Sequence, residues 1–301
     1  MKPTRAEPDV ADPPLAAAVI EWYDANARDL PWRQRGTSAW AVLVSEVMLQ
    51  QTPVTRVLPV WESWLRRWPS ASGLAADSPG EAVRAWGKLG YPRRALRLHE
   101  AAVVIADRFD GVVPTDLSAL LALPGVGDYT GRAVACFAYG QRHAVVDTNV
   151  RRFVTRAVLG QAGSMPPLAA RDLALVEALL PAEAAAAARF SVAAMELGAL
   201  VCTARVPKCS ACPVNTGCRW LRDGRPAYDG PVRRAQRFIG TDRQVRGLLL
   251  DVLRGSYGAV PAEALTVAWA DAEQRDRALA GLIIDGLIAV GPDGSYALPD
   301  R

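Results

Sequence analysis

Four cysteines in one short stretch constrain this chain more than any other feature of its sequence. They follow the spacing C-x6-C-x2-C-x5-C, at Cys202, Cys209, Cys212 and Cys218. Intracellular proteins rarely keep structural disulfides, so such a tight group favours metal binding. A zinc site usually pairs two short knuckles, and only one C-x2-C is present, whereas four thiolates on one loop also suit a cubane iron–sulfur cluster. The spacing therefore predicts a metal site and leaves the metal open.

Apolar periodicity predicts a mainly α-helical fold around this loop. Apolar residues recur at three- and four-residue spacing, and Pro, Gly, Asp and Asn mark the breaks between segments. The expected helices before the loop span residues 14–27, 39–51, 54–67, 81–88, 92–109, 117–123, 130–139, 150–159, 169–180 and 190–201. Residues 182–188 are nearly all alanine and leave helix or connector open. Cys136 lies in an apolar stretch and is expected to be a small core residue.

Composition places the chain among globular proteins. It has 301 residues, 50% of them hydrophobic, which is enough for two packed subdomains. No apolar run reaches the ~18 residues of a membrane span. Residues 1–16 are polar and read as a disordered tail without a secretory signal, so we expect a cytoplasmic, nucleoid-associated protein. The net charge of +4 permits nucleic-acid binding but does not argue for it.

The last 60 or so residues form a separate pattern. Residues 226–241 are expected to be a linker. Helices are predicted at 242–254, 261–269 and 271–285, followed by a hairpin of strands 287–290 and 295–298, so 242–301 resembles a winged-helix unit. Its third helix carries Arg275 and Arg277, which favours DNA binding, but acids dilute that face. Docking against the rest of the chain or a protein partner is therefore an equal alternative.

The sequence LPGVG at 123–127 lies between two predicted helices, 117–123 and 130–139. Gly125 and Gly127 allow a tight turn, so backbone N–H groups can point at a phosphate from the start of the next helix. A Pro-Gly connector is common between helices, so this motif alone predicts a phosphate hairpin only weakly.

Two carboxylates occupy unusual sequence positions. Glu46 has Val42, Leu43 and Leu49 as its helical neighbours, so we expect partial desolvation to raise its pKa. Asp147 precedes a basic helix, where an Asp ordinarily serves as an N-cap, and capping is compatible with catalysis. Cleavage of an N-glycosidic bond needs an acid for the leaving base and a carboxylate for the sugar cation. The target base must also leave the helical stack.

The motifs together resemble a known family. They are LPWR at 30–33, SEVMLQQT at 45–52, LGY at 89–91, LPGVG at 123–127, VDTN at 146–149, MELG at 195–198 and the four cysteines. This order resembles the helix–hairpin–helix DNA glycosylases with a [4Fe-4S] cluster, and among them the MutY-type adenine DNA glycosylases, over residues 17–225. The resemblance implies two helical subdomains and a monomer that excises adenine mispaired with guanine or 8-oxoguanine in double-stranded DNA during base-excision repair.

The resemblance also implies residue roles. Glu46 looks like the acid that protonates adenine N7, Asp147 like the carboxylate that stabilises the sugar cation, and Asn149 like the residue that positions one of these acids. The adenine pocket would be formed by Arg28, Trp32, Arg33 and Glu196. Gln50, Gln51 and Tyr91 would be wedge residues, which fill the gap in the base stack. The other DNA-contacting residues would be Thr52, the hairpin residues Leu123, Gly125, Val126 and Gly127, and Lys208 of the basic cysteine loop. The cluster, held by the four cysteines, would be structural and not a redox centre.

Two alternatives remain open at this point. Endonuclease III-like enzymes remove oxidised pyrimidines and cut the strand through a lysine amine, but that position is Tyr129 here, and a phenol cannot form the imine. A non-catalytic lesion-binding module would not need both Glu46 and Asp147. MutY-type proteins usually end in a Nudix-like domain that helps recognise 8-oxoguanine. The residues after Gly240 follow a different pattern, so the preference between the two mispairs stays open.

Overall fold

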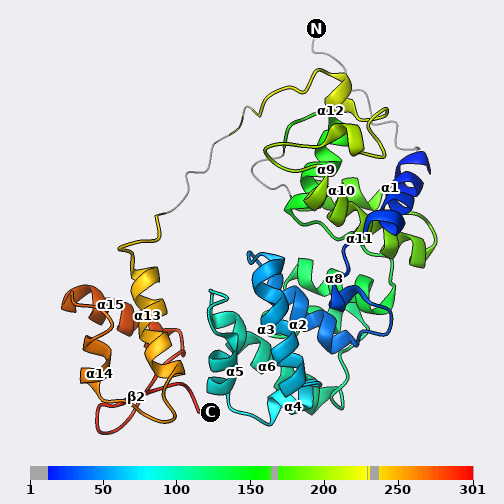
Figure 1. Ribbon diagram of the computed structural model, residues 1–301. Helices are drawn as coiled ribbons and strands as arrows, with labels where there is room; N and C mark the ends of the chain where they lie inside the picture. Colours follow the sequence, from blue (N-terminus) through cyan, green and yellow to red (C-terminus); the bar gives the residue numbers. More distant parts are fainter. Residues whose placement is uncertain (1–12, 164–168, 229, 231–236, 301) are drawn as a thin grey trace. The chain divides into compact units, whose positions relative to one another are not determined.

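The protein was analysed as a computed structural model, which describes residues 13–163, 169–228, 230 and 237–300. The mainly helical class expected from the sequence is confirmed (Figure 1). The chain divides into two compact units, one of residues 1–37 and 128–233 and the other of residues 38–127 and 234–301. None of the described helices is long and apolar enough to cross a lipid bilayer.

The first unit is built around the long helix α11. Its elements are α1 (Pro13–Asn26), η1 (Pro31–Arg33), α8 (Asp128–Tyr139), α9 (Thr148–Leu159), α10 (Ala169–Glu177), α11 (Ala184–Leu200), η2 (Cys209–Ala211) and α12 (Arg219–Arg222). Helix α11 packs against α1, α9 and α8. Phe153 and Phe190 are fully buried in the core, and Cys136 is buried there as expected.

Four helix starts in this unit differ from the sequence-based expectation, by six residues for α11 and by one or two residues for α1, α8 and α9. Helix α11 begins at Ala184, six residues before the expected residue 190, because Glu183 caps it by accepting hydrogen bonds from the N–H groups of Ala185 and Ala186. The alanine run is therefore helical. Helix α1 begins at Pro13, inside the stretch expected as a tail, and residues 1–12 of that stretch lie outside the described residues.

In residues 38–127 of the second unit, helix α6 is the central element. The helices are α2 (Ala39–Leu49), α3 (Val54–Arg67), α4 (Ala71–Ala75), α5 (Pro79–Trp86), α6 (Arg93–Arg108) and α7 (Leu117–Leu121). Helix α6 packs against α4, α5 and α2. The Trp64 ring meets the rings of Trp68 and Trp86 edge-on, with centroids 4.7 and 5.7 Å away. The sequence analysis missed α4, a helix of five residues capped by Ser70.

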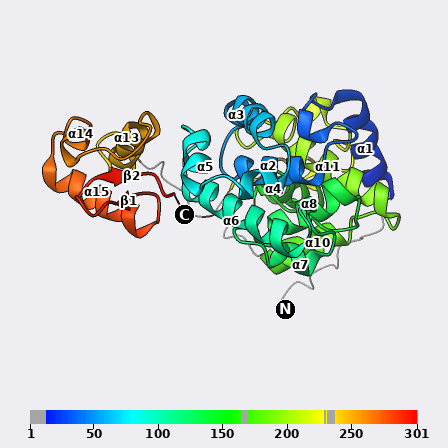
Figure 2. The same cartoon turned by 90° about the horizontal axis from the view of Figure 1, so that it is seen from below.

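The C-terminal part of the second unit has the expected order of three helices and a hairpin. These are α13 (Asp242–Arg254), α14 (Ala262–Thr266), α15 (Ala272–Ile284), β1 (Ala289–Val290) and β2 (Tyr296–Ala297). The strands are antiparallel, with Ala289 opposite Ala297, and Val260 adds an isolated bridge to Tyr296. Figure 2 shows the three helices gathered beside this hairpin. Residues 229 and 231–236 of the predicted linker lie outside the described part of the chain.

Candidate functional site

Asp147 is the N-cap of α9, as the sequence indicated. Its Oδ1 accepts hydrogen bonds from the N–H groups of Asn149 and Val150, at 2.9 and 2.7 Å. Its Oδ2 accepts one from the Asn149 side-chain amide at 2.6 Å. Burial raises the pKa of the Asp147 carboxyl above its ordinary value, although these hydrogen bonds favour the charged form. The cap therefore holds a partly desolvated carboxylate in one orientation.

Arg152 extends this arrangement to the cysteine loop. Its guanidinium donates to Oδ1 of Asn149 at 2.8 Å and to the carbonyl oxygens of Gly198 and Cys202, at 2.5 and 2.6 Å. Gly198 allows the approach, because a Cβ atom there would lie 2.6 Å from the Asn149 carbonyl oxygen. Sequence reasoning missed Arg152. Its spacing of four residues from Arg156 on α9 places both arginines on one helical face, and that was the available signal.

A buried ion cluster joins α11 to the segment after α1. Arg28 donates to both carboxylate oxygens of Glu196, at 2.6 and 2.7 Å, and Arg33 lies 3.7 Å from the same carboxylate. Burial alone would raise the pKa of Glu196, but the Arg28 hydrogen bonds and the Arg33 charge hold it below its ordinary value. Trp32 is buried in the same turn, η1. The structure thus brings together the four residues predicted to form the adenine pocket.

The four loop cysteines line one cavity. Phe153, Val201 and Val214 supply apolar walls. Arg156 is buried beneath the loop, where it donates to the carbonyl oxygen of Thr203 at 2.7 Å and stacks over the Trp220 ring. Burial raises the pKa of the Cys212 thiol to about 11. A cation at this position would favour its thiolate.

The donor set of this cavity, four thiols, is one that both a [4Fe-4S] cluster and a zinc ion take in proteins. Among the described residues, no group of three or more His, Cys, Asp or Glu side chains is arranged to hold one metal ion. Four cysteines around a shared cavity are the ligand set of a cubane iron–sulfur cluster. The residues present therefore fit a cluster. Lys208, the predicted phosphate contact on this loop, is exposed.

Glu46 lies in the second unit, on a helix that is buried on nearly every side. In α2, all residues from Trp40 to Met48 are buried, and Glu46 is only 3% exposed. Ser38 caps the helix start by accepting a hydrogen bond from the Ala41 N–H. The expected apolar surroundings of Glu46 are therefore present. Such burial keeps most of the Glu46 side chain away from bulk water.

Arg94 organises the predicted wedge residues, and sequence reasoning missed it. Its guanidinium donates to the carbonyl oxygens of Gln50 and Gly90 at 2.6 and 3.0 Å, and to Thr52 Oγ1 at 3.0 Å. It also donates to the carbonyls of residues 47 and 48, the last turn of α2, and stacks over Tyr91. Burial lowers the pKa of Arg94 to about 10. Its position after a Pro at a helix start gave no signal of this role.

Two residues beside Arg94 have backbone conformations that favour glycine. Gln51 has φ of 56° and Tyr91 has φ of 47°. Each such conformation costs on the order of 1–3 kcal/mol in a non-glycine residue, and these conformations cluster at functional sites. Tyr91 is also 51% exposed, which is unusual for a large ring. Strain and exposure together support the expectation that these residues contact a ligand.

The predicted phosphate turn lies between α7 and α8. Leu123 and Val126 are buried while Gly125 and Gly127 are exposed, so the turn is anchored by its apolar residues and presents its glycine backbone. Gly125 has φ of +76°, and a Cβ atom there would lie 2.6 Å from the Arg97 Cβ. Both observations explain why glycine is needed. Tyr129 follows in the first turn of α8 and is half-buried.

The chain is similar to DNA-repair proteins. Residues 44–177 match the HhH-GPD superfamily of base excision DNA repair proteins. A relative from Mycolicibacterium smegmatis named adenine DNA glycosylase is 60% identical over 282 residues, covering 93% of this chain and 94% of that protein.

Solved structures give the same picture of the fold. A thermostable thymine-DNA glycosylase superposes with a TM-score of 0.62 and 27% identity, covering 69% of this chain and 95% of that one. An endonuclease III–DNA covalent intermediate gives a TM-score of 0.59 over 70% of this chain and 96% of that one. Its identity is 20%, so it demonstrates a shared fold alone.

Proposed function

The chain belongs to the adenine DNA glycosylase family, and we propose that it hydrolyses the N-glycosidic bond of adenine mispaired with guanine or 8-oxoguanine in double-stranded DNA. The observation that carries this proposal is the 60% identity to an adenine DNA glycosylase along nearly the whole of both chains. Tyr129 at the predicted lysine position further supports a hydrolase without strand-cutting chemistry. We propose that the protein acts as a monomer in the cytoplasm, on nucleoid DNA.

In the proposed reaction, the bond between the sugar C1′ and adenine N9 breaks and water supplies the new C1′ hydroxyl. Glu46 protonates adenine at N7, so the base leaves as a neutral molecule, and the proton that the attacking water loses restores the Glu46 acid. Asp147, fixed by its N-cap hydrogen bonds, stabilises the positive charge that develops on the sugar. Gln50, Gln51 and Tyr91 fill the gap that the extruded adenine leaves in the stack.

The four loop cysteines would hold a [4Fe-4S] cluster. When bound, the cluster would stabilise the loop and keep its basic residues, including Lys208, facing DNA phosphates. Arg156 and Arg152 fasten the loop backbone to α9 through the carbonyls of Thr203 and Cys202. Purified protein should contain about four irons per chain and absorb visible light. A colourless protein with one zinc per chain would contradict this assignment.

The activity is tested by single-turnover excision on duplexes that carry A:8-oxoG, A:G, A:C or thymine glycol, with and without alkali. We expect adenine release from the purine mispairs and strand breakage only after alkali. Breakage before alkali, or preference for thymine glycol, would replace the proposal with an endonuclease III-like activity.

The acid is tested by Glu46→Gln, which preserves shape and removes the proton. We expect excision to fall at least ~100-fold, because general acid catalysis typically contributes that much. Duplex affinity should be retained. Excision within a few-fold of the wild-type rate would remove Glu46 from the mechanism.

A further inference from the structure

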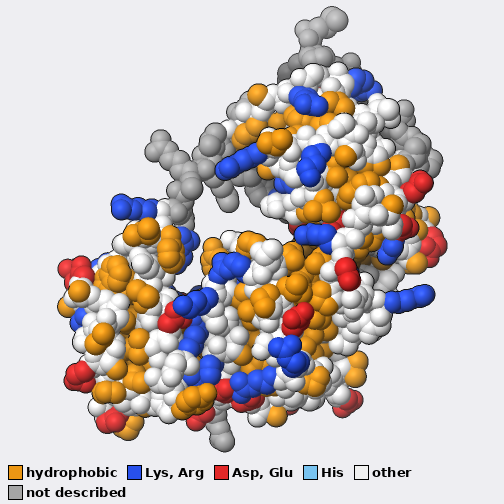
Figure 3. Space-filling view, viewed as in Figure 1, with side chains coloured by type: hydrophobic (Ala, Val, Ile, Leu, Met, Phe, Trp, Pro, Cys, Tyr) orange, Lys and Arg blue, Asp and Glu red, His pale blue; other side chains and the backbone are white. Residues whose placement is uncertain are grey.

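A basic groove of about 1080 Å³ lies within the second unit, beside the predicted wedge residues. One wall carries Gln50, Gln51 and Tyr91, and the other carries α13 together with Phe238. Its seven basic lining residues are Arg56, Lys88, Arg93, Arg94, Arg243, Arg246 and Arg254. Figure 3 shows Lys and Arg side chains gathered along the boundary between α13 and the part of the unit that contains α5.

The two acidic residues of the groove are already engaged. Asp251 pairs with Lys88 and with Arg254, at 3.4 and 3.2 Å. Asp285 pairs with Arg246, and with Arg93 at 3.2 Å. Seven cations against two paired acids leave the groove with a net positive charge, which attracts a polyanion.

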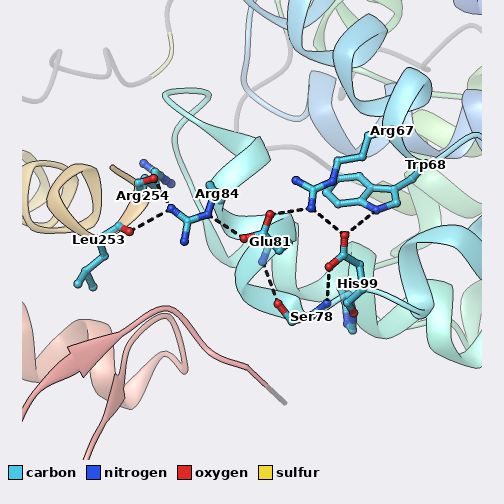
Figure 4. Close-up of polar contacts among 9 residues, drawn as sticks. Arg67, Trp68, Ser78, Glu81, Arg84, His99, Leu253 and Arg254 are labelled. Atoms are coloured by element: carbon cyan, nitrogen blue, oxygen red, sulfur yellow. Dashed lines mark hydrogen bonds and ion pairs between the residues drawn. The ribbon is translucent and has the colours of Figure 1, made fainter. Parts of the chain in front are cut away.

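Contacts between α5 and α13 hold the groove wall that contains α13 in place. Arg84 of α5 donates to the carbonyl oxygens of Leu253, at 3.3 Å, and Arg254 (Figure 4). Arg254 returns a hydrogen bond to the Val83 carbonyl at 3.1 Å. The Gly80 N–H donates to the carbonyl oxygen of Pro299 at 2.6 Å, so the C-terminal segment is also attached to α5. The C-terminal segment therefore packs against α5, which agrees with the alternative that this segment docks against the rest of the chain.

Exposed aromatic rings lie among the groove's cations. Tyr91 and Phe238 are each 51% exposed, and the Arg243 guanidinium lies 5.2 Å from the centre of the Phe238 ring. Exposed rings that alternate with arginines are the usual platform for unstacked bases and their phosphates. A folded protein partner would favour an apolar centre with few charges instead.

The third helix, by contrast, has its arginines occupied within the unit. Arg277 of α15 pairs with Asp242 at 2.8 Å, and Arg275 donates to the Trp269 carbonyl at 2.9 Å. Both arginines of α15 therefore have partners within the unit, and the DNA-binding role suggested for them by the sequence stays a prediction. The cationic wall is formed by α13.

We propose that this groove binds a strand of the DNA substrate next to the mispair, with phosphates along Arg56, Lys88 and Arg243 and an unstacked base against Phe238. The inference rests on the proposed activity on DNA. It assigns to α13 a contact with substrate that the glycosylase motifs, all at residue 218 or earlier, do not supply.

The test uses the full chain and a labelled duplex of about 30 bp with a central A:G mispair, titrated at several salt concentrations. Arg243→Glu should weaken affinity about tenfold and reduce the salt slope by about one or more, because a phosphate contact is lost. Arg243→Lys should stay within about threefold of wild type, since it keeps the charge. The matched control Arg277→Glu reverses a charge on α15 and should also stay within about threefold. Equal losses of duplex affinity in Arg243→Glu and Arg277→Glu would contradict the proposed DNA binding by the groove.

A second pair of variants tests the docked wall without changing charge. A Cβ atom at Gly80 would lie 2.5 Å from the Pro299 carbonyl oxygen, whereas one at Gly73 would meet its nearest atom at an ordinary 3.5 Å. Gly80→Ala should therefore weaken duplex binding, and Gly73→Ala should not. Equal affinities for these two variants would contradict the proposed role of the docked wall. Adenine release by the wild type on the same duplex distinguishes failure of the proposed activity from failure of the proposed groove. No release would contradict the adenine glycosylase activity. Normal release, together with wild-type duplex affinity of the Arg243 variants, would contradict only DNA binding by the groove.

Discussion

Asp147 and Glu196 are carboxylates of the first unit, the former partly buried and the latter fully buried, and their surroundings act on ionisation in opposite directions. Asp147 receives neutral donors at a helix start, and burial still raises its pKa. Glu196 is enclosed by Arg28 and Arg33, and its pKa is lowered despite burial. A neutral cap therefore fixes the position of a carboxylate and leaves it short of positive charge, whereas an arginine clamp neutralises it.

This difference separates two tasks within one site. A carboxylate that stabilises a transient cation works best when no cation is bonded to it directly. The hydrogen-bond donors of Asp147 are neutral, and the charge of Arg152, which bonds to Asn149, is the smallest of the influences that lower the pKa of Asp147. Glu196 instead forms ion pairs with Arg28 and Arg33, and these pairs hold the segment of residues 28–33 against α11. Chemistry is expected to depend on Asp147 and architecture on Glu196.

The largest expected effect is that of Asp147→Asn on excision. Loss of the negative charge should slow single-turnover adenine release at least ~100-fold, because the sugar cation loses its stabilising partner. Circular dichroism and yield are needed as controls, since Asp147 also caps α9. If the variant released adenine at nearly the wild-type rate, Asp147 would be a cap and nothing more.

Glu196→Gln should act mainly on stability. It leaves the charges of Arg28 and Arg33 without a counterion, so we expect the free energy of unfolding to fall by about 2 kcal/mol. Denaturant unfolding measures this change. An unchanged stability together with a complete loss of excision would reverse the division of tasks.

Arg152→Lys should have a smaller, kinetic effect. A lysine keeps the charge but cannot reach Asn149 and the carbonyls of Gly198 and Cys202 together. Asn149, which donates a hydrogen bond to Asp147, would then be held less firmly. Losing one such hydrogen bond predicts a roughly tenfold slower excision step. Duplex affinity should change little. A loss of affinity with a normal rate would place Arg152 at the DNA surface instead.

The smallest effect is a contrast in pH dependence. The pKa of Asp147 is raised on folding, so its stabilising contribution is complete below its ordinary value of 3.8 and is lost as pH rises through the folded value. The pKa of Glu196 is lowered, so its contribution is present above 4.5 and is lost as pH falls through the folded value. From about pH 4 to 7, the melting temperature of Asp147→Asn should gain on wild type while that of Glu196→Gln falls behind. If the melting temperatures of both variants changed in the same direction relative to wild type as pH rises, the contrast between Asp147 and Glu196 would be contradicted.

Sequence reasoning reached the groups whose chemistry is local. The N-cap role of Asp147, the apolar surroundings of Glu46 and the burial of Cys136 all follow from neighbours within one or two helical turns. Arg94 and Arg152 were missed because most of their partners are backbone carbonyls of distant segments, and any residue supplies a carbonyl. The pairing of Arg277 with Asp242 was missed for a related reason, since the two residues lie 35 positions apart in the sequence.

The arrangement of the first unit also has a consequence during synthesis. Helix α1 is made early, but its partner α11 lies far along the chain, and Arg28 must wait for Glu196, 168 residues later. At ribosomal rates of ~5–20 residues per second, that delay is about 10–30 s. Val19 and Tyr23, which end in the core, remain uncovered by α11 throughout. The apolar face of α1 therefore stays exposed on the nascent chain for a time in which a chaperone can bind it. Residues 38–127 emerge from the ribosome during the same period.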